Sequence, residues 1–334
     1  MPRYLGHLPA HDPLNQYLSH EILPQLGYDN GPVKFRIFGL GGSHGVYLYE
    51  ERHTDIKIVG KYFGRPHGHS NGIHKGMERE FHALQTLRGR GLTGYPHHVV
   101  RPLGMNGALS NLLVLEHVGG RPLYTIIEDA IHHNQRDGLF DSLTSLGYFL
   151  ATFHNRTASG IGVDFNRDAG YLDMMVDHLR ERRFIGAAEQ DEFRWLRDRW
   201  REQGRMWSDQ QVMLHGDATP ANLLFGGGRQ VLAIDLEMTT HGDRVFDVGL
   251  VAGEIQHIFL RFTGNKYAAE PFIGHFLWEY SCHFPDRHAA FRSITGRVPF
   301  HMAVTLLRIA GNSWLHDSYR SRLIEEAKIT LRTF

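Results

Sequence analysis

Apolar and polar positions follow two different periodicities in the two halves of the chain. Five segments of the first half either alternate between apolar and polar residues or run apolar, which is typical of strands. They are residues 33–40 (VKFRIFGL), 45–51 (GVYLYEE), 55–64 (DIKIVGKYFG), 97–104 (HHVVRPLG) and 111–118 (NLLVLEHV). The glycine-rich GLGGSHG between the first two indicates a hairpin. This half therefore predicts a five-stranded antiparallel sheet.

One segment of the first half has helical spacing instead. Met77, Phe81, Leu84 and Leu87 recur at intervals of three and four residues, and glycines end the segment. It predicts one main helix beside the sheet. Together these elements form a first lobe over residues 1–118.

The pattern becomes mainly helical after Gly119. Leu143, Leu146, Leu150 and Phe153 share one helical face, and residues 189–203 form a charged amphipathic helix. Two short strands, NLLF and VLAID, interrupt the helices and are separated by the turn GGGRQ. The sequence thus predicts an α+β protein with two lobes, the second being the mostly helical residues 119–334. Residues 117–121 would connect them.

Composition and charge mainly exclude some classes of partner and compartment. The 334 residues include 36 basic and 36 acidic ones, so net charge gives no general reason to bind nucleic acid. The single cysteine, Cys282, has no partner for an internal disulfide, which fits a reducing compartment. The N-terminus lacks the pattern of a secretion signal, and no run of about eighteen apolar residues predicts a membrane helix. These features predict a cytoplasmic protein with no membrane or nucleic-acid partner.

Candidate chemistry concentrates in LHGDATPANLLF, residues 214–225. Asp217 precedes Asn222 by five positions, and Asp235 ends the strand VLAID eighteen residues after Asp217. A hairpin joining the two short strands would bring Asn222 and Asp235 close, and their hard oxygen ligands suit Mg²⁺. Asp217 would stand beside that site, where it could orient a hydroxyl and accept its proton. His215 more plausibly braces the loop.

These residues carry a family resemblance. HGDATPAN, followed by IDLE and GDRVFDVG, resembles the catalytic loop, metal-binding segment and downstream motif of the aminoglycoside phosphotransferase and choline-kinase-like family. The resemblance implies a bilobal, protein kinase-like fold, with Asp217 as base and Asn222 and Asp235 as metal ligands. DLE stands where protein kinases have D-F-G, which favours a small acceptor. The match extends over about residues 35–250.

The upstream part of the resemblance concerns nucleotide binding. GLGGSHG is similar to the loop that covers the phosphates, which assigns Gly41, Gly42 and Ser43 to that role. A strand lysine should bind the phosphates. Lys61 fits the family's spacing better, and Lys57 remains the alternative because both have the same strand parity.

A helical glutamate should hold that lysine, and a connector should hold the adenine. Glu80 is the preferred glutamate and Glu78 the alternative, since the two point roughly 200° apart on a helix. LVLEHVGG resembles the connector, where backbone groups from Glu116 to Val118 would hydrogen-bond an adenine.

The predicted function is ATP- and Mg²⁺-dependent phosphorylation of a hydroxyl on a small molecule, such as an aminoglycoside, a sugar or an amino alcohol. A nucleotide-binding pseudokinase or regulatory protein is the main alternative, and an ATPase or a protein kinase are further rivals. Cationic acceptors would need a cluster of carboxylates, for which the candidates are Asp173, Asp177, Glu237, Glu254 and Asp317. Aromatic candidates that could stack on an acceptor are Trp278, Tyr280 and Trp314.

Two further aspartates lie in GDRVFDVG. Asp243 is expected near the acceptor pocket or the metal. Asp247, within RVFDVG, is expected to hydrogen-bond the catalytic loop.

Overall fold

The computed structural model describes residues 3–28, 33–41, 45–64 and 70–333. The chain divides into two compact units. Unit 1 comprises Met1–Gly120 with Leu232–Met238, and unit 2 comprises Arg121–Val231 with Thr239–Phe334. The short segment Leu232–Met238 thus returns from the second half of the chain to the first unit, and it carries Asp235.

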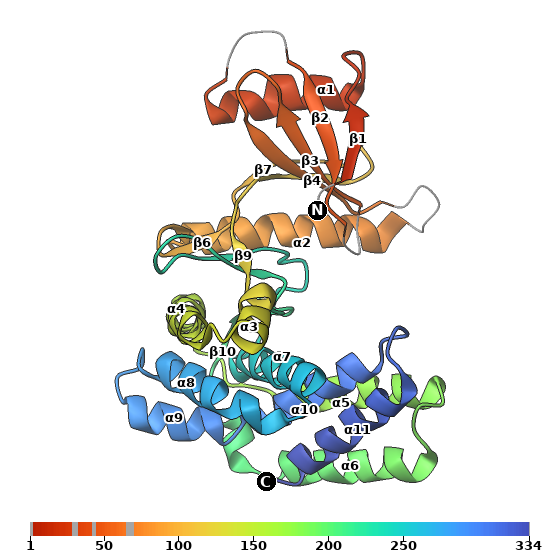
Figure 1. Ribbon diagram of the computed structural model, residues 1–334, viewed down its shortest axis with the longest axis vertical. Coiled ribbons are helices and arrows are strands. Elements are labelled where there is room, and N and C mark those ends of the chain that lie inside the picture. Colours follow the sequence, from red (N-terminus) through yellow and green to blue (C-terminus); the bar gives the residue numbers. More distant parts are fainter. Residues whose placement is uncertain (1–2, 29–32, 42–44, 65–69, 334) are drawn as a thin grey trace. The chain divides into compact units, whose positions relative to one another are not determined.

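Unit 1 is built on an antiparallel sheet of six strands in the order β1-β2-β3-β4-β8-β7 (Figure 1). The strands are β1 (Arg3–His7), β2 (Phe35–Gly39), β3 (Gly45–Glu51), β4 (Lys57–Tyr62), β7 (Pro102–Asn106) and β8 (Leu112–Glu116). Outside this sheet, β5 (Thr93–Gly94) pairs with β6 (His97–Val99).

The antiparallel sheet and its main helix are confirmed, but the predicted count of five strands is wrong. β1 was missed because four of its five residues are exposed, so it shows no apolar alternation. The segment 97–104, expected as one strand, contains β6 and the start of β7. Each strand of the sheet except β1 lies within or overlaps a predicted segment.

The two faces of this sheet have different partners. The segment formed by α1 (Pro13–Tyr17), η1 (Leu18–Ile22) and η2 (Leu23–Leu26) packs its apolar residues against Phe35, Tyr49 and Ile58. Because side chains alternate along a strand, Lys61 points to the face opposite Ile58. That second face meets α2 (Ser70–Gly89), through the contact of Lys61 with Glu80.

Unit 2 is mostly helical. Its helices are α3 (Leu123–His132), α4 (Arg136–Arg156), α5 (Phe165–Glu181), α6 (Ala187–Arg201), α7 (Val245–Thr263), α8 (Glu270–Ser281), α9 (Arg287–Thr295), α10 (Val298–Ala310) and α11 (Asp317–Leu331), with short 3₁₀ turns η3 (Gly204–Trp207) and η4 (Lys266–Ala269). None of the described helices combines the length and apolar character that crossing a membrane requires.

The sequence periodicity accounts for the core of unit 2. Leu143, Leu146, Leu150 and Phe153, expected on one face of a helix, are all fully buried on α4. A second cluster joins α5, α6, α10 and α11, and in it the buried Trp200 donates from Nε1 to the carbonyl of Leu331 at 2.8 Å. Apolar burial of this extent is the main source of folding free energy.

Short strands position the polar loops of unit 2. β10 (Gln211–Leu214) pairs with β13 (Thr240–Asp243), and β9 (Arg121–Pro122) pairs with β11 (Leu223–Phe225). Residues 215–222, between β10 and β11, form the loop that carries Asp217 and Asn222. The following strand, β12 (Val231–Ala233), leads into the segment of unit 1 that carries Asp235.

Candidate active site

The loop of residues 215–222 is held by a buried carboxylate from α7. Asp247 accepts hydrogen bonds from the backbone N–H of His215 at 2.7 Å and of Gly216 at 3.0 Å, as the sequence predicts. Its other partner is His154 Nε2, at 3.1 Å. Burial opposes ionisation of Asp247, but the bonds from His154 and the loop outweigh it and lower the pKa of Asp247.

The backbone of this loop depends on a glycine. Gly216 has φ +80°, in the left-handed region that other residues rarely adopt. This turn places the backbone N–H of Asp217 3.3 Å from Nδ1 of His215, whose ring is fully buried. His215 therefore braces the loop, as expected, and Asp217 faces away from the core with a partly exposed carboxylate.

Both oxygens of the Asp217 carboxylate have a donor. Nδ2 of Asn222 donates to Oδ2 of Asp217 at 3.0 Å and to its carbonyl at 2.9 Å. Nη1 of Arg308, on α10, donates to Oδ1 at 3.2 Å. Because Asn222 donates through its nitrogen, its side-chain oxygen is left to act as a ligand. Asp217 and Asn222 are thus adjacent within unit 2.

Arg308 is a residue that the sequence analysis missed. Its Nη2 donates to Oε1 of Glu254, on α7, at 2.5 Å, so one guanidinium joins Glu254 to Asp217. Burial raises the pKa of Glu254 despite the facing Arg308. Arg308 lies 91 residues from Asp217 in the sequence, and no local motif marks it.

A second polar cluster lies in unit 1, around Lys61. Its Nζ lies 2.7 Å from Glu80 Oε2 and 3.0 Å from Glu237 Oε2, and it also contacts Asp235 Oδ1. Burial opposes the charge on Lys61, but Glu80 and Asp235 outweigh it and raise the pKa of the ammonium. Lys61 is therefore a charged group inside a carboxylate cluster, which we call the lysine cluster: Lys61, Glu80, Asp235 and Glu237.

The structure distinguishes the alternatives that strand and helix parity left open. Lys57 lies at the exposed start of β4 and pairs with Glu50 at 3.5 Å. Glu78 is exposed on α2, whereas Glu80 is fully buried and also accepts from the backbone N–H of Leu236 at 3.2 Å. The residues paired across the sheet and α2 are therefore Lys61 and Glu80.

Asp235 has an uncommon backbone conformation. Its φ is +62°, in the left-handed region, where aspartate is tolerated better than most residues at some cost in free energy. Ligand oxygens of Glu80, Asp235 and Glu237 lie within 4.8 Å of one another. Three carboxylates share the single ammonium of Lys61, and the remaining negative charge suits a divalent cation with a preference for hard oxygen donors.

Other predicted nucleotide-binding positions are only partly described. Gly42 and Ser43 lie outside the described residues. Gly41 has φ +79°, as a tight glycine loop requires. The backbone N–H of Glu116 donates to the carbonyl of Arg101 at 2.9 Å, so this N–H already has a hydrogen-bond partner within the protein. Val118 lies in the segment that follows β8.

The five carboxylates considered for a cationic acceptor do not gather into one cluster. Four of them face a basic residue of unit 2, in the pairs Asp173–Arg197, Asp177–Arg194, Glu254–Arg308 and Asp317–Arg320, whereas Glu237 belongs to the lysine cluster of unit 1. Asp243, expected near the acceptor pocket or metal, is instead buried and paired with Arg297. The described part of unit 2 thus offers no group of free acids beside Asp217.

The three aromatic candidates differ in their exposure to solvent. Tyr280 is fully buried and its hydroxyl lies 2.8 Å from Nδ1 of His154, so it belongs to the core. Trp278 is half-buried on α8. Trp314 is 59% exposed in the segment between α10 and α11. Only the last presents most of an indole ring to solvent.

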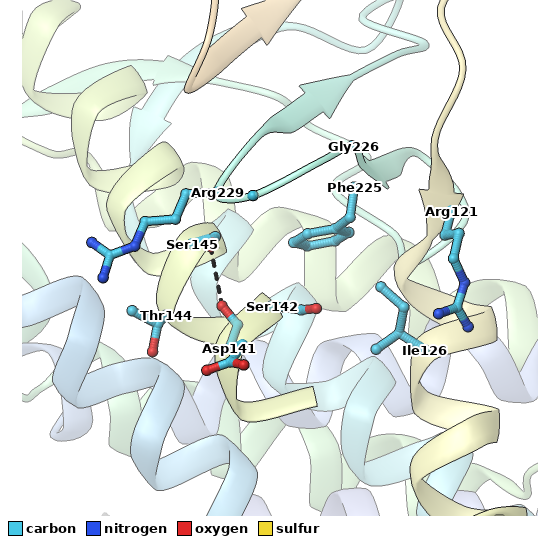
Figure 2. Close-up of a pocket in the computed structure, with 10 residues that line it drawn as sticks. Arg121, Ile126, Asp141, Ser142, Thr144, Ser145, Phe225, Gly226 and Arg229 are labelled. Atoms are coloured by element: carbon cyan, nitrogen blue, oxygen red, sulfur yellow. Dashed lines mark hydrogen bonds between the residues drawn. The ribbon is translucent and has the colours of Figure 1, made fainter. Parts of the chain in front are cut away.

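A cavity of about 420 Å³ lies elsewhere in unit 2 (Figure 2). In this view the ring of Phe225 lies between the side chains of Arg121 and Arg229. The serine and threonine hydroxyl groups that line the cavity already have partners. Ser142 and Ser145 donate to carbonyls one helical turn earlier, and the hydroxyl of Thr144 lies 2.8 Å from Nε2 of His275. None of residues 215–222 lines this cavity, so the cavity is distinct from the loop that carries Asp217.

Comparison with known proteins decides the family. The model of the phosphotransferase enzyme family matches residues 57–278, more than half of the chain. The chain belongs to the phosphotransferase enzyme family. No curated protein matches it.

Solved structures of family-like kinases share the fold at low sequence identity. The choline kinase LicA of Streptococcus pneumoniae is 15% identical, with a TM-score of 0.57 over 97% of this chain and 100% of that one. An ethanolamine kinase of Plasmodium vivax is 12% identical, with a TM-score of 0.61 over 95% and 88%. The gentamicin complex of APH(2'')-IIa is 12% identical, with a TM-score of 0.56 over 98% and 97%. This phosphotransferase therefore has the protein kinase-like fold.

Proposed function

We propose that this phosphotransferase transfers the terminal phosphate of ATP to a hydroxyl of a small molecule, with Asp217 as the proton acceptor. The observation that carries the proposal is the pair of donors on the Asp217 carboxylate. Asn222 and Arg308 fix its two oxygens, and each oxygen keeps a lone pair with which it can accept from a hydroxyl. Such positioning is most of what phosphoryl transfer requires of a protein.

In the proposed reaction, Asp217 orients the acceptor hydroxyl towards the terminal phosphorus. A bond forms between the hydroxyl oxygen and that phosphorus, the bond to the bridging oxygen of ADP breaks, and Asp217 takes the hydroxyl proton. Lys61 holds phosphate oxygens of the nucleotide and is itself held by Glu80. These roles are supported by the charge of Lys61 and by the rigid anchoring of the loop through Asp247.

Magnesium fits the residues available. Asp235 is the proposed principal ligand, with Asn222 contributing its side-chain oxygen, and the carboxylate-rich surroundings of Asp235 favour a hard divalent cation. Mg²⁺ neutralises charge on the phosphates when bound. Titration of activity against Mg²⁺ and against Ca²⁺ would measure this requirement.

A coupled ADP-release screen tests the function. The acceptors are sugars, amino alcohols, hydroxy acids and aminoglycosides, each with the wild-type protein and with Asp217→Asn. We expect acceptor-dependent ADP release, reduced about 10³-fold in kcat for Asp217→Asn because a general base is lost, with unchanged nucleotide affinity. Equal turnover by the variant would remove Asp217 from the proposed role. ADP release that needs no acceptor would indicate an ATPase, and nucleotide binding without release a pseudokinase.

A further inference from the structure

One face of α7 leads away from Asp217 and is bordered by arginines. Glu254, His257 and Arg261 recur at intervals of three and four residues, so they lie on one side of the helix. At one end of this face, Glu254 binds Arg308, which in turn binds Asp217. We call this row, Glu254, His257 and Arg261, the α7 face. It spans about 10 Å, at the usual rise per residue of a helix.

The middle of the α7 face is neutral. His257 Nδ1 lies 3.1 Å from the hydroxyl of Tyr319, on α11. Burial, and then the charges of Arg261 and Arg308, lower the pKa of His257 to about 4. The ring therefore carries no charge at neutral pH. α10 lies beside α7 in Figure 1.

The far end of the α7 face joins a cation to an exposed aromatic ring. The guanidinium of Arg261 lies 5.3 Å from the ring centre of Trp314. Arg261 is exposed and forms no ion pair with a carboxylate among the described residues. The helix dipole and the indole ring stabilise its charge. Neither feature explains why most of a tryptophan side chain remains in contact with solvent.

Arg261 is also linked to the catalytic loop from the other side. The backbone N–H of Tyr124, at the start of α3, donates to the carbonyl of Pro220 in that loop at 3.1 Å. Arg261 lowers the pKa of the Tyr124 hydroxyl, although burial and Glu128, which hydrogen-bonds this hydroxyl, raise it overall. Glu128 is thus already engaged by Tyr124.

We propose that Arg261 and Trp314 form a subsite for an acidic group of the acceptor, a carboxylate or a phosphate, with an adjoining ring stacked on Trp314. The inference rests on the proposed function and names its substrate class: a hydroxyl compound that carries a negative charge remote from the phosphorylated hydroxyl. A polycationic acceptor would face the guanidinium group of Arg261, while the carboxylates that could have bound it are paired with basic residues. Guanidinium groups bind carboxylates and phosphates through paired hydrogen bonds.

Matched acceptors test the charge preference. Lactose and lactobionate share a galactose ring, and only lactobionate carries a carboxylate at the far end. Glucosamine, glucose and glucose 6-phosphate form a second series, in which the sugar carries an amine, no charged group or a phosphate. We expect an acidic member to exceed its neutral counterpart about tenfold in kcat/KM, the gain of one charge-assisted hydrogen bond. A preference for the amine over the acids would overturn the proposal.

Substitutions test which residues cause the preference for acidic acceptors. Arg261→Gln should abolish the advantage of the acids through KM and leave the neutral sugars unchanged, and Trp314→Ala should weaken both members of each pair. Arg287→Gln is the matched control, because Arg287 also lies over a tryptophan, at 5.6 Å from the ring centre of Trp278. Equal losses for acidic and neutral acceptors in Arg261→Gln would contradict the subsite.

Calorimetry separates this inference from the proposed function. Lactobionate and glucose 6-phosphate are titrated into the whole protein with Mg²⁺ and a non-hydrolysable ATP analogue. Binding that Arg261→Gln weakens, without any phosphate transfer, would support the subsite and count against the proposed function. Transfer to neutral sugars with no Arg261-dependent binding of either acid would support the function and overturn the subsite.

Discussion

The lysine cluster of unit 1 and the Asp247 network of unit 2 affect a buried carboxylate in opposite ways: burial raises the pKa of Glu80 despite the facing Lys61, whereas the partners of Asp247 lower its pKa. In the lysine cluster, three carboxylates share one ammonium group. In the second region, Asp247 is stabilised by two backbone N–H groups and one histidine. The first arrangement depends on an ion pair, and the second on hydrogen bonds from His154 and from the backbone of the loop that Asp247 positions.

The difference bears on what each region can do. An ammonium on a long side chain can exchange a carboxylate for a phosphate, which fits the proposed role of Lys61. Backbone N–H groups cannot move without moving the loop, so Asp247 fixes the conformation from which Asp217 projects. A third carboxylate, Asp168 on α5, extends the comparison, because burial and then the charge of Asp243 raise its pKa to about 8.

The largest expected effect concerns the ammonium. Lys61→Met leaves the carboxylates of the lysine cluster without their counter-charge, and breaking a buried ion pair in this way costs about 3 kcal/mol of the free energy of unfolding. We also expect kcat/KM for ATP to fall about 100-fold, since the proposed phosphate contact is lost. Urea unfolding and steady-state kinetics measure the two effects.

Lys57→Met is the matched control for this change. Lys57 lies on the same strand and on the same face but is partly exposed, with only a 3.5 Å contact to Glu50. It should leave both quantities nearly unchanged. Similar losses in the two variants would show that the charge of the strand, and not the lysine cluster, matters.

A smaller effect is expected when Asp247 loses its charge. Asp247→Asn weakens the bonds to the N–H groups of His215 and Gly216, so the free energy of unfolding should fall by about 2 kcal/mol. Because the loop is then less well fixed, kcat should fall with little change in the KM for ATP. Asp177→Asn, at an exposed acid paired with Arg194, is the control. An unchanged kcat in Asp247→Asn would separate loop anchoring from catalysis.

The smallest effect concerns Asp168 and depends on pH. Burial, and then Asp243, raise the pKa of Asp168 to about 8, above the ordinary value of 3.8. A carboxyl group with a raised pKa in the folded state stabilises the protein at low pH, and this contribution is lost as the pH rises through about 8. Asp168→Asn mimics the protonated form. It should match the wild type near pH 4 and exceed its unfolding free energy by at least about 1 kcal/mol at pH 9. Parallel stability curves from pH 4 to 9 would contradict this account.

Local sequence was sufficient for elements with one buried face. β2, β3, β4 and α4 have a core side and a solvent or polar side, and the resulting periodicity is visible in single segments. β1 escaped prediction because it is mostly exposed. The loop HGDATPAN could also be recognised from the sequence, since its polar residues are separated by short spacings and its left-handed turn lies at a glycine, Gly216.

The tertiary structure decided which charges meet. Lys61 and Asp235 are 174 residues apart, and Arg308 is 91 residues from Asp217, so their pairing depends on how whole strands and helices pack. Parity along a strand or helix shows which residues share a face but not which partner faces them. The sequence therefore determined the change from strands to helices along the chain, and it marked the loop of residues 215–222 and the candidate base. Packing alone decided between Lys61 and Lys57, assigned acids to their basic partners and placed Arg308 beside Asp217. Electrostatic pairing acts through space over a few ångströms, so it produces no periodic pattern in the sequence.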